Sequence, residues 1–370
     1  MYKYNIFPIY QKMTTEEKYM SRCLQLARAG LYGAAPNPMV GAVIVHKGEI
    51  IGEGYHIHCG GPHAEVNAIN SVKKKDLLKE STIYVSLEPC AHYGKTPPCA
   101  DLIIREGIPH VVIGCTDPFA KVNGLGIKKL TDAGIDVKTG ILEQECVALN
   151  KRFFTFHLHK RPYITLKWAE SADGFIDGKR PEGETGHPVK LSNSYTQMLV
   201  HRLRSINRAI LVGTRTAIAD NPALTNRTWP GPAPLRLVID REGKLPDTLQ
   251  LFDGSTPTRV YLGSEAARPD YLNHPNTEGR YIDFKENILP QIMDDLYQHQ
   301  IQSLLVEGGK QLLESFINNG LWDEIYIEQA PVRLYEGTPA PQIPSGLTET
   351  SVIDDHQLLH ITNKAQISIK

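Results

Sequence analysis

Two short segments in the first hundred residues contain residue types that could bind a metal. His63 and Glu65 stand at the start of a predicted helix, and Cys90 and Cys99 follow downstream. One histidine and two cysteines supply three zinc ligands, and a catalytic zinc site keeps its fourth position for water. Zinc lowers the pKa of that water to about 7, so the water becomes a nucleophile at neutral pH. The pattern predicts a hydrolytic zinc centre.

Glu65 would give this centre its proton chemistry. A carboxylate beside the metal can take a proton from the water, pass it to a ring nitrogen and help ammonia leave. The order H-x-E, then P-C, then a second cysteine is the signature of zinc-dependent nucleobase deaminases. Two other interpretations stay open. One is a set of buried thiols with a surface histidine. The other is a structural zinc site with a fourth ligand from Cys59 or His92.

The second half of the chain contains a different group of polar residues. Glu307 ends a predicted buried strand and precedes Gly308 and Gly309, whose backbone could approach a pyrophosphate at a helix start. A Gly-Gly pair before a helix is also often just a tight turn. No predicted strand is followed by the G-x-G-x-x-G pattern of ordinary dinucleotide-binding folds. These residues alone do not identify the reaction of the second half of the chain.

The elements that must position these residues alternate between strands and helices, which predicts a mixed or parallel sheet with helices on its faces. A T-x-x-E capping box at Thr14 and Glu17 predicts the start of the first helix. The basic, aromatic stretch 151–161 predicts an interdomain connection with its aromatic side chains packed inward. Residues 213–216 predict a Gly/Thr turn. The predicted strands are 40–45, 49–55, 82–87, 110–114, 163–168, 209–213, 235–240, 259–262, 303–307 and 324–328. The predicted helices are 63–72, 99–105, 125–132, 194–205, 288–299 and 311–318.

Length and composition set the limits for these interpretations. A chain of 370 residues predicts two or three domains. The net charge of −1 argues against a broad nucleic-acid surface, which needs clustered positive charge. No apolar run approaches the roughly 20 residues of a membrane helix, and the N-terminus lacks a secretory h-region. A cytoplasmic location is therefore expected. All six cysteines lie in the first 150 residues, which favours metal binding or catalysis over disulfides.

The sequence around the predicted ligands resembles one family closely. The segments PNPMVGAVIV, GEGYH, HAE and SLEPCAHYGKTPPC resemble the RibD/RibG family, the bifunctional pyrimidine deaminase/reductases of riboflavin biosynthesis. Eight residues separate Cys90 from Cys99, whereas many nucleoside and nucleic-acid deaminases have C-x-x-C. The resemblance extends over nearly the whole chain, because the second half also fits the reductase of that family.

The resemblance implies an α/β protein of two domains. Residues 14–158 would form a cytidine-deaminase-like three-layer α/β/α domain, and residues 161–370 a dihydrofolate-reductase-like α/β domain. The implied first reaction is zinc-dependent deamination of 2,5-diamino-6-ribosylamino-4(3H)-pyrimidinone 5′-phosphate. The implied second reaction reduces the ribosyl group to ribityl with NADPH. The expected cofactors are one Zn²⁺ per chain and NADPH. The expected partners are this small-molecule substrate and a second copy of the chain, with neither nucleic acid nor membrane.

The resemblance also implies roles for individual residues. In the first domain the zinc ligands would be His63, Cys90 and Cys99. The proton shuttle would be Glu65. Substrate would meet Asn37, His56 and Lys95. In the second domain the catalytic residues would be Lys167 and Glu307. Substrate would meet Arg204, Leu224 and Arg227. NADPH would meet Glu170, Lys190, Thr216, Asp220, Gly308 and Gly309.

Several alternatives stay open at this point. Asn37 could be a turn residue between two prolines, and Lys167 and Glu307 could form a simple salt bridge. Where the family usually has S-x-W-I-[ST], this chain has Lys190 in place of the tryptophan, within the segment 187–193. That departure keeps open a deaminase with a degenerate reductase. A nucleoside or tRNA deaminase and a non-enzymatic, zinc-stabilised binding module are the remaining alternatives.

Overall fold

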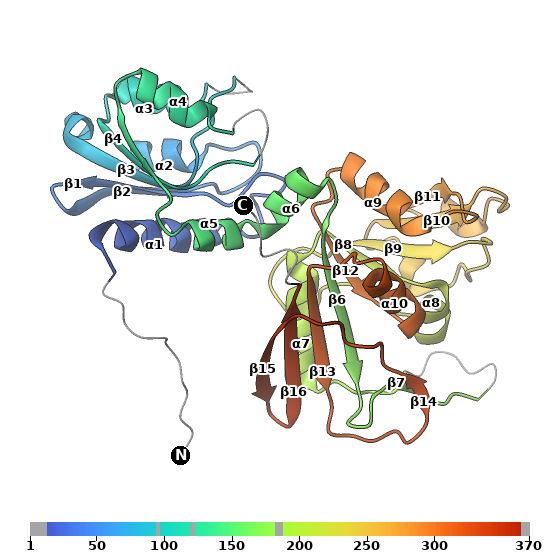
Figure 1. Ribbon diagram of the computed structural model, residues 1–370. Coiled ribbons are helices and arrows are strands. Elements are labelled where there is room, and N and C mark those ends of the chain that lie inside the picture. Colours follow the sequence, from blue (N-terminus) through green and yellow to red (C-terminus); the bar gives the residue numbers. More distant parts are fainter. Residues whose placement is uncertain (1–12, 94–96, 119–122, 182–187, 364–370) are drawn as a thin grey trace, which may run out of the picture. The chain divides into compact units, whose positions relative to one another are not determined.

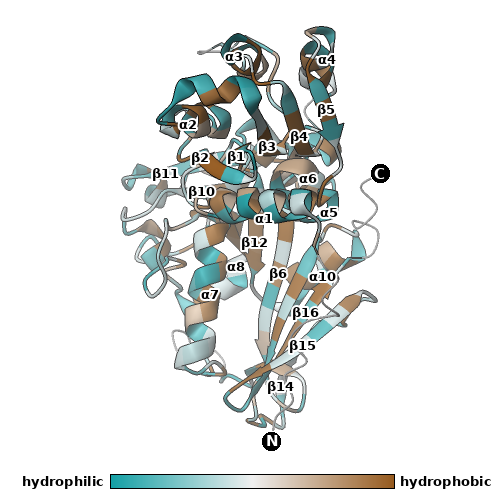
Figure 2. Cartoon of the chain, turned by 90° about the vertical axis from the view of Figure 1, so that its left-hand side faces the viewer, coloured by the Kyte–Doolittle hydropathy of each residue, from teal (hydrophilic) through white to brown (hydrophobic). Residues whose placement is uncertain are grey.

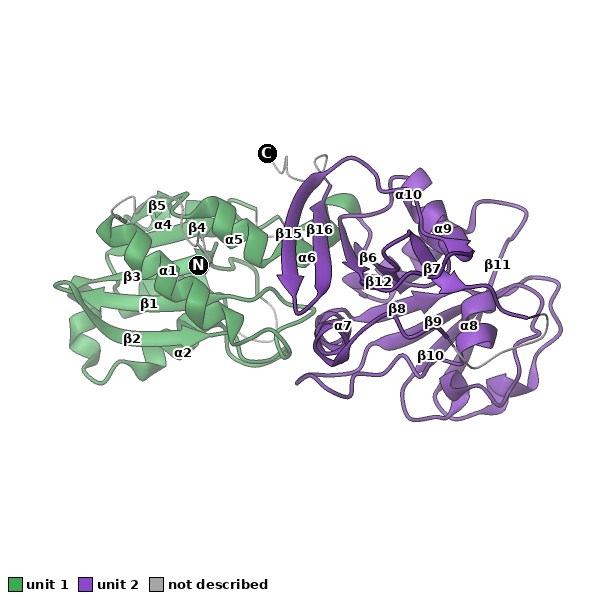
Figure 3. Cartoon of the chain, turned by 90° about the horizontal axis from the view of Figure 1, so that it is seen from below, with its two compact units in different colours: residues 1–159 green, residues 160–370 purple. Residues whose placement is uncertain are grey.

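The computed structural model describes residues 13–93, 97–118, 123–181 and 188–363. The predictions that concern the N-terminal segment, Lys95 and His187 therefore lie outside the described residues. The chain divides into two compact units, residues 1–159 and 160–370, and each has its own sheet (Figure 3). No helix in the described ranges is long and apolar enough to cross a membrane.

The sheet of the first unit has five strands in the order β2-β1-β3-β4-β5 (Figure 1). β1 pairs antiparallel with both β2 and β3, whereas β3, β4 and β5 are parallel. β3 and β4 are buried along almost their whole length, and Figure 2 shows hydrophobic colouring on both. The strands are β1 (Gly41–His46), β2 (Glu49–Tyr55), β3 (Ser81–Leu87), β4 (His110–Cys115) and β5 (Asp136–Thr139).

Helices cover both faces of this sheet, which makes the first unit a three-layer α/β/α fold, as predicted. One face packs against α1 (Thr15–Arg28) and α5 (Glu143–Leu149). The other buries apolar side chains of α2 (Ala64–Ser71), α3 (Cys99–Glu106) and α4 (Leu125–Asp132). A short 3-10 segment (Lys75–Glu80) precedes β3.

Local sequence signals explain where several of these helices begin and end. The capping box is present at α1, since the side chain of Thr14 accepts from the N–H of Glu17 and the Glu17 carboxylate accepts from the N–H of Thr14. α3 ends at Gly107, whose φ of 70° favours glycine. The stretch after α5 forms α6 (Lys151–His159), which buries its phenylalanines, as predicted for the aromatic connection.

The sheet of the second unit has nine strands in the order β11-β10-β9-β8-β12-β6-β13-β16-β15. The strands from β11 to β13 are parallel, and β16 and β15 complete the sheet in antiparallel pairing. The strands are β6 (Tyr163–Glu170), β8 (Ala209–Val212), β9 (Leu235–Asp240), β10 (Thr258–Gly263), β11 (Thr277–Ile282), β12 (Ser303–Glu307), β13 (Glu324–Gln329), β15 (Leu347–Ile353) and β16 (His356–Thr362). A separate two-stranded ribbon pairs β7 (Phe175–Gly178) with β14 (Gly337–Pro339).

Both faces of the parallel part are buried, as expected for a parallel sheet. Along β12, Leu304 and Val306 join one apolar cluster and Leu305 joins the other, because successive side chains point to opposite faces. The first cluster includes α9 (Ile288–Gln298) and α10 (Lys310–Asn318). The second includes α8 (Thr214–Asp220), with α7 (Ser194–Ile206) packed against it. Two 3-10 segments complete the unit (Gln250–Phe252 and Asp270–Asn273).

The predicted strands and helices are present, with ends that differ by at most two residues. The predicted turn at 213–216 is wrong. Gly213 is the N-cap of α8, and the hydroxyl of Thr214 donates to the carbonyl of Ile239 at 2.5 Å. Burial of Ala217 holds this short helix in place, which outweighs the weak helix propensity of its threonines.

Candidate active sites

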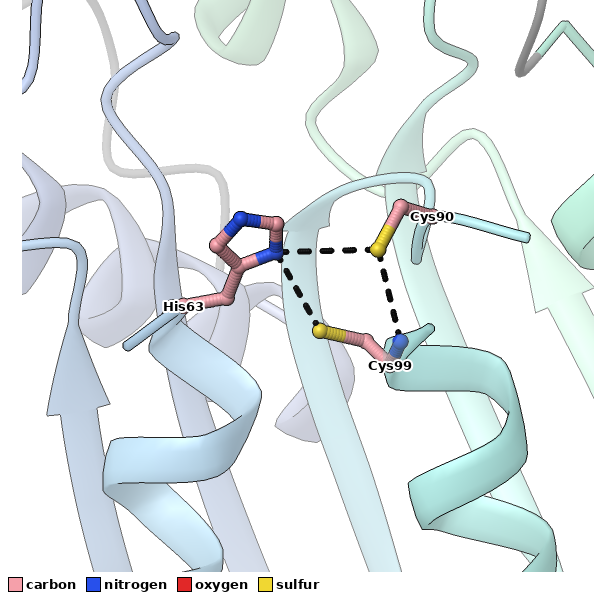
Figure 4. A group of neighbouring side chains, drawn as sticks. All are labelled: His63, Cys90 and Cys99. Carbon is pink, nitrogen blue, oxygen red and sulfur yellow. Dashed lines mark hydrogen bonds between the residues drawn. The ribbon is translucent and has the colours of Figure 1, made fainter. Parts of the chain in front are cut away.

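The three predicted zinc ligands meet at one point of the first unit (Figure 4). His63 is the N-cap of α2, Cys99 is the first residue of α3, and Cys90 lies in the loop after β3. The Nδ1 atom of His63 is 3.6 Å from the Sγ atom of Cys90 and 3.3 Å from that of Cys99. All three ligand atoms lie within 4.8 Å of one another, which one ion could bridge.

The chemistry of this cluster fits zinc. Its donors are one imidazole nitrogen and two sulfurs, the soft set that zinc prefers. The neighbouring Cys99 thiol and the His63 ring lower the pKa of the Cys90 thiol to about 4, so a thiolate is available there. Within the described part of the chain, neither Cys59 nor His92 joins the cluster. Three protein ligands are typical of a catalytic rather than a structural zinc site.

Glu65 lies beside the cluster without joining it. The residue is in the first turn of α2, and only 3% of its surface is exposed. Burial raises the pKa of its carboxyl group, and the Cys99 thiol interacts with it. A buried carboxyl group with a raised pKa next to a metal site is suited to accepting and returning protons. Its role as the proton shuttle stays a prediction.

Asn37 and His56 contact each other next to these ligands. The Nδ1–H of His56 donates to the carbonyl of Pro62 at 3.0 Å, so its Nε2 accepts from the Nδ2 group of Asn37 at 3.1 Å. His56 is 3% exposed, and burial lowers its pKa, which favours the neutral ring. These contacts orient the Asn37 amide and leave its Oδ1 atom as an acceptor. The predicted contact of His56 with a phosphate stays untested, and Lys95 lies outside the described residues.

Asn150 is a functional candidate that sequence reasoning missed. Its Oδ1 atom accepts from the N–H of Met39 at 2.8 Å, and its Nδ2 group donates to the carbonyl of Met39 at 2.9 Å. This reciprocal pair fixes the loop that carries Asn37. No local pattern could have found it, because the two residues are 111 positions apart.

The second unit contains a cleft of about 1870 Å³. The cleft lies at the carboxyl ends of parallel strands such as β8, β9 and β12, where open α/β sheets bind their ligands. Its lining includes nine of the predicted residues: Lys167, Arg204, Thr216, Asp220, Leu224, Arg227, Glu307, Gly308 and Gly309. Glu170 and Lys190 are not among the lining residues.

A buried ion pair forms one wall of this cleft. The Arg204 guanidinium faces the Glu307 carboxylate with two hydrogen bonds, of 3.1 and 2.7 Å. Burial opposes ionisation of Glu307, but the charge and the hydrogen bonds of Arg204, together with other nearby positive groups, outweigh burial, so the pKa of the carboxyl group is lowered. Lys167 on β6 is in register with Glu307 on β12, and its charge lowers that pKa further. The wall therefore carries one carboxylate and two cations.

Thr216 and Asp220 lie on α8 at another part of the cleft. The Thr216 hydroxyl accepts from the N–H of Gly309 at 3.0 Å, which joins α8 to the Gly-Gly turn. The Asp220 carboxylate is paired with Arg180 at 2.5 Å, and Arg180 also pairs with Asp177 at 2.7 Å. Sequence reasoning missed Arg180 and Asp177, because they follow the D-G loop in a segment without a pattern.

The segment with Leu224 and Arg227 is held in an unusual conformation. Leu224 is buried and has a φ of 51°, a left-handed conformation that non-glycine residues rarely adopt. The backbone N–H of Arg227 donates to the Nδ1 atom of His201 at 3.0 Å. Burial lowers the pKa of His201, consistent with a ring nitrogen that accepts. His201 thus helps to position the Arg227 loop.

The two predicted cofactor residues outside the lining have other contacts. Glu170 is buried and accepts from the Nε1–H of Trp168 at 2.8 Å and from the Nε2 group of Gln329 at 2.7 Å. Lys190 is exposed. The next residue, Leu191, is held by a hydrogen bond, because its carbonyl accepts from the Nε2 atom of His356 at 3.0 Å.

Two family models match the chain. Residues 13–115 match the model described as the cytidine and deoxycytidylate deaminase zinc-binding region. Residues 162–362 match the RibD C-terminal domain. The first match contains all three zinc ligands and Glu65, and the second contains the whole lining of the cleft.

Similar proteins are known from other organisms. The riboflavin biosynthesis protein RibD of Bacillus amyloliquefaciens is 40% identical over 335 residues, which cover 90% of this chain and 88% of the relative. The Aquifex aeolicus RibD is 39% identical, with 87% and 88% covered.

Solved structures agree with this similarity. The Thermotoga maritima diaminohydroxyphosphoribosylaminopyrimidine deaminase/5-amino-6-(5-phosphoribosylamino)uracil reductase has a TM-score of 0.83 and 35% identity, with 94% of this chain and 99% of that chain covered. The Acinetobacter baumannii RibD has a TM-score of 0.82 and 31% identity, with 94% and 98% covered. The chain belongs to the RibD family of bifunctional deaminase/reductases of riboflavin biosynthesis.

Proposed function

We propose that this chain catalyses two successive reactions on one pyrimidine ribosyl phosphate. Residues 14–158 would deaminate 2,5-diamino-6-ribosylamino-4(3H)-pyrimidinone 5′-phosphate to 5-amino-6-ribosylaminouracil 5′-phosphate. Residues 161–370 would then reduce the ribosyl group to ribityl with NADPH. One observation carries the proposal. Each unit assembles its own set of reactive residues, the zinc ligands with Glu65 in one and the Lys167–Glu307 cleft in the other.

The first reaction is a hydrolysis, so water replaces the amino group and ammonia leaves. His63, Cys90 and Cys99 would hold zinc, which supplies a strongly acidified water when it is bound. Glu65 would take the proton from the attacking water, deliver it to the ring nitrogen and then protonate the leaving amine. Its burial supports this role, because bulk water is kept away from the carboxyl group.

Asn37 is proposed to bind the substrate of this first reaction. The Nδ2 group of its amide is occupied by His56, so Oδ1 is left to accept a hydrogen bond from the pyrimidine or the ribose. His56 and Asn150 fix this arrangement from two sides, and a preorganised polar group loses little entropy on binding.

The second reaction breaks the bond between C1′ and the ring oxygen of the ribose, and adds a hydride to C1′ and a proton to that oxygen. NADPH supplies the hydride when it is bound. Lys167 would supply the proton, and its position next to Glu307 in the sheet and in the lining of the cleft supports this role. Arg204 and Arg227 would bind the substrate, since guanidinium groups suit a phosphate. Leu224 would contact the same substrate from its strained loop.

The dinucleotide is proposed to lie along α8 and the Gly-Gly turn. Gly308 and Gly309 allow close backbone approach, and Thr216 and Asp220 line the same part of the cleft. The cleft exceeds the roughly 300–1,000 Å³ of ordinary ligand pockets, which supports two ligands bound side by side. The proposal also includes contacts of Glu170 and Lys190 with NADPH, although neither residue lines the cleft.

We also propose a cellular setting for the protein. A homo-oligomer in the cytoplasm, without nucleic-acid or membrane partners, is consistent with the balanced charge of 40 basic and 41 acidic residues.

The test gives the purified protein the diamino-pyrimidinone ribosyl phosphate, with and without NADPH, and follows ammonia and the absorbance of NADPH together. Ammonia without NADPH, followed by NADPH oxidation when it is added, is the expected result. Ammonia alone would contradict the second reaction and leave a deaminase with a degenerate reductase. If zinc-loaded protein produced neither ammonia nor NADPH oxidation, both proposed reactions would be overturned.

A further inference from the structure

Glu88 carries a buried carboxylate that the reactions proposed above do not use. It immediately precedes Pro89 and the zinc ligand Cys90, and only 4% of its surface is exposed. Its two oxygens accept four backbone N–H groups from one distant segment. Oε2 accepts from Asp117 at 3.2 Å and Gly124 at 3.0 Å. Oε1 accepts from Gly126 at 2.9 Å and Ile127 at 3.3 Å.

The same segment also touches the peptide that follows Glu88. A Cβ atom added at Gly126 would lie 2.0 Å from the carbonyl oxygen of Pro89, so only glycine allows the present approach. The N–H of Glu88 donates to the carbonyl of Cys115 at 3.0 Å. The chain before Cys90 is thus fixed through a side chain, a close backbone contact and a main-chain hydrogen bond.

Cys90 itself is held by the start of α3. The N–H of Ala100 donates to the carbonyl of Cys90 at 3.2 Å, and the N–H of Cys99 donates to the sulfur of Cys90 at 3.3 Å. A shift of the Pro89–Cys90 peptide would therefore change the distance between the two zinc-binding sulfurs.

We propose that Glu88 is a positioning residue of the deaminase site. Its carboxylate binds the backbone N–H groups of Asp117, Gly124, Gly126 and Ile127 and so holds these four residues against the Pro89–Cys90 peptide. This contact would set the position from which the Cys90 sulfur binds the metal. The inference rests on the proposed zinc-dependent deaminase and names a residue that this reaction needs without touching the substrate. Loss of a group that orients a metal ligand typically costs about 10–100-fold in metal affinity or activity.

Glu88→Gln is the informative substitution, because it keeps the shape of the side chain. A carboxylate accepts at both oxygens, whereas an amide accepts at one atom and donates at the other. Two of the four backbone N–H groups would then face a donor. A buried donor without an acceptor costs more than a missing hydrogen bond on the surface, so the segment should move away from Pro89.

The matched control is Asp323→Asn in the second unit. Asp323 is also a buried carboxylate that binds a backbone N–H group. It accepts from the N–H of Ile164 at 2.6 Å and pairs with Arg161. It neither lines the cleft nor belongs to the zinc cluster. Asp323→Asn should lower the thermal stability without changing metal binding.

The experiment measures zinc affinity by competition with a chelator and the absorption spectrum of the cobalt(II)-substituted protein. The sulfur-to-cobalt bands report the geometry of the thiolate ligands, which a loss of stability alone would not move. Glu88→Gln should weaken zinc binding about 10–100-fold and shift those bands, and Asp323→Asn should leave both unchanged. Wild-type affinity and bands in Glu88→Gln would overturn the inference.

A measurement on the unmodified protein keeps the inference testable if Glu88→Gln does not fold. Coupling between two sites is reciprocal, so zinc should also stabilise the clamped segment. Amide hydrogen exchange in residues 123–127 should speed up when zinc is removed, whereas β10 in the second unit should not change. Equal exchange in 123–127 with and without zinc would overturn the inference. If the wild-type protein released no ammonia, that result would instead contradict the proposed function and not this inference.

Discussion

Arg204 and Glu307 form an ion pair with two hydrogen bonds in the wall of the reductase cleft, although 103 positions separate them in the sequence. Nε of Arg204 lies 3.1 Å from Oε1 of Glu307, and Nη2 lies 2.7 Å from Oε2. Both side chains are largely buried. The pair explains how an acidic group can stay ionised inside the cleft, and it fixes the arginine in an orientation that a lone surface residue would not have.

Arg204→Lys should lower the kcat/KM of the reductase roughly tenfold. Lysine keeps the positive charge but loses the planar fork, so one charged hydrogen bond of about 1.5 kcal/mol is lost. The measurement is NADPH oxidation with the deaminated substrate. Ammonia release by the same protein is the internal control, because Arg204 belongs to the second unit. An unchanged kcat/KM would show that the fork is not needed.

Glu65→Gln should stop deamination while zinc stays bound. The amide cannot carry the proton from water to the ring, and general acid–base catalysis typically contributes about 10²–10⁴-fold. Ammonia release should fall by at least about 10²-fold, with the zinc content per chain unchanged. Retained ammonia release would contradict the shuttle. Loss of zinc together with activity would assign Glu65 to metal retention.

Removal of zinc should separate the two activities. The three metal ligands lie in the first unit and the cleft is lined by residues of the second. Protein treated with a strong chelator should release no ammonia but should still oxidise NADPH with the deaminated substrate, and added zinc should restore the first activity. A parallel loss of both activities would mean that the second unit depends on the metal.

His356 should stabilise the second unit more at pH 6 than at pH 9. Burial opposes its protonation, but its Nε2 atom faces the Leu191 carbonyl at 3.0 Å and its Nδ1 atom faces Asp355 at 2.8 Å. With Glu328 nearby, these acceptors raise the pKa of the ring. A raised pKa stabilises the fold at low pH, and this contribution is lost as the pH rises through the folded-state pKa.

The measurement compares the free energy of unfolding of wild type and His356→Gln over this pH range. The difference should be on the order of 1 kcal/mol at pH 6 and smaller at pH 9. A difference that does not change with pH would mean that the ring is held neutral.

Much of the fold could be predicted because local signals agree with the tertiary structure. The Thr14–Glu17 capping box fixes the start of α1, and β2, β9 and β12 match their predicted limits. Several elements could not be predicted, and α8 and β7 show why. α8 is stabilised by burial of Ala217 rather than by its sequence, and β7 depends on pairing with β14 more than 150 positions away.

The zinc ligands could be predicted because their residue types are rare and their order is specific. The groups that orient them could not. Glu88 binds backbone amides and Asn150 binds a backbone peptide, so their partners carry no side-chain pattern to search for. The Arg204–Glu307 pair has recognisable types, but any of many acidic residues could have been the partner. Long-range pairing is decided by the fold.

The zinc ligands and the residues of the cleft lie in different units, and this separation determines how the pathway would fail in a cell short of zinc. In the proposed order of reactions, only the earlier step needs the metal, and all of its ligands sit in one unit. A starved cell would therefore accumulate the diamino compound and none of the deaminated intermediate, while its reductase stayed competent and idle. Resupply of zinc would restart flavin synthesis without any new protein being made.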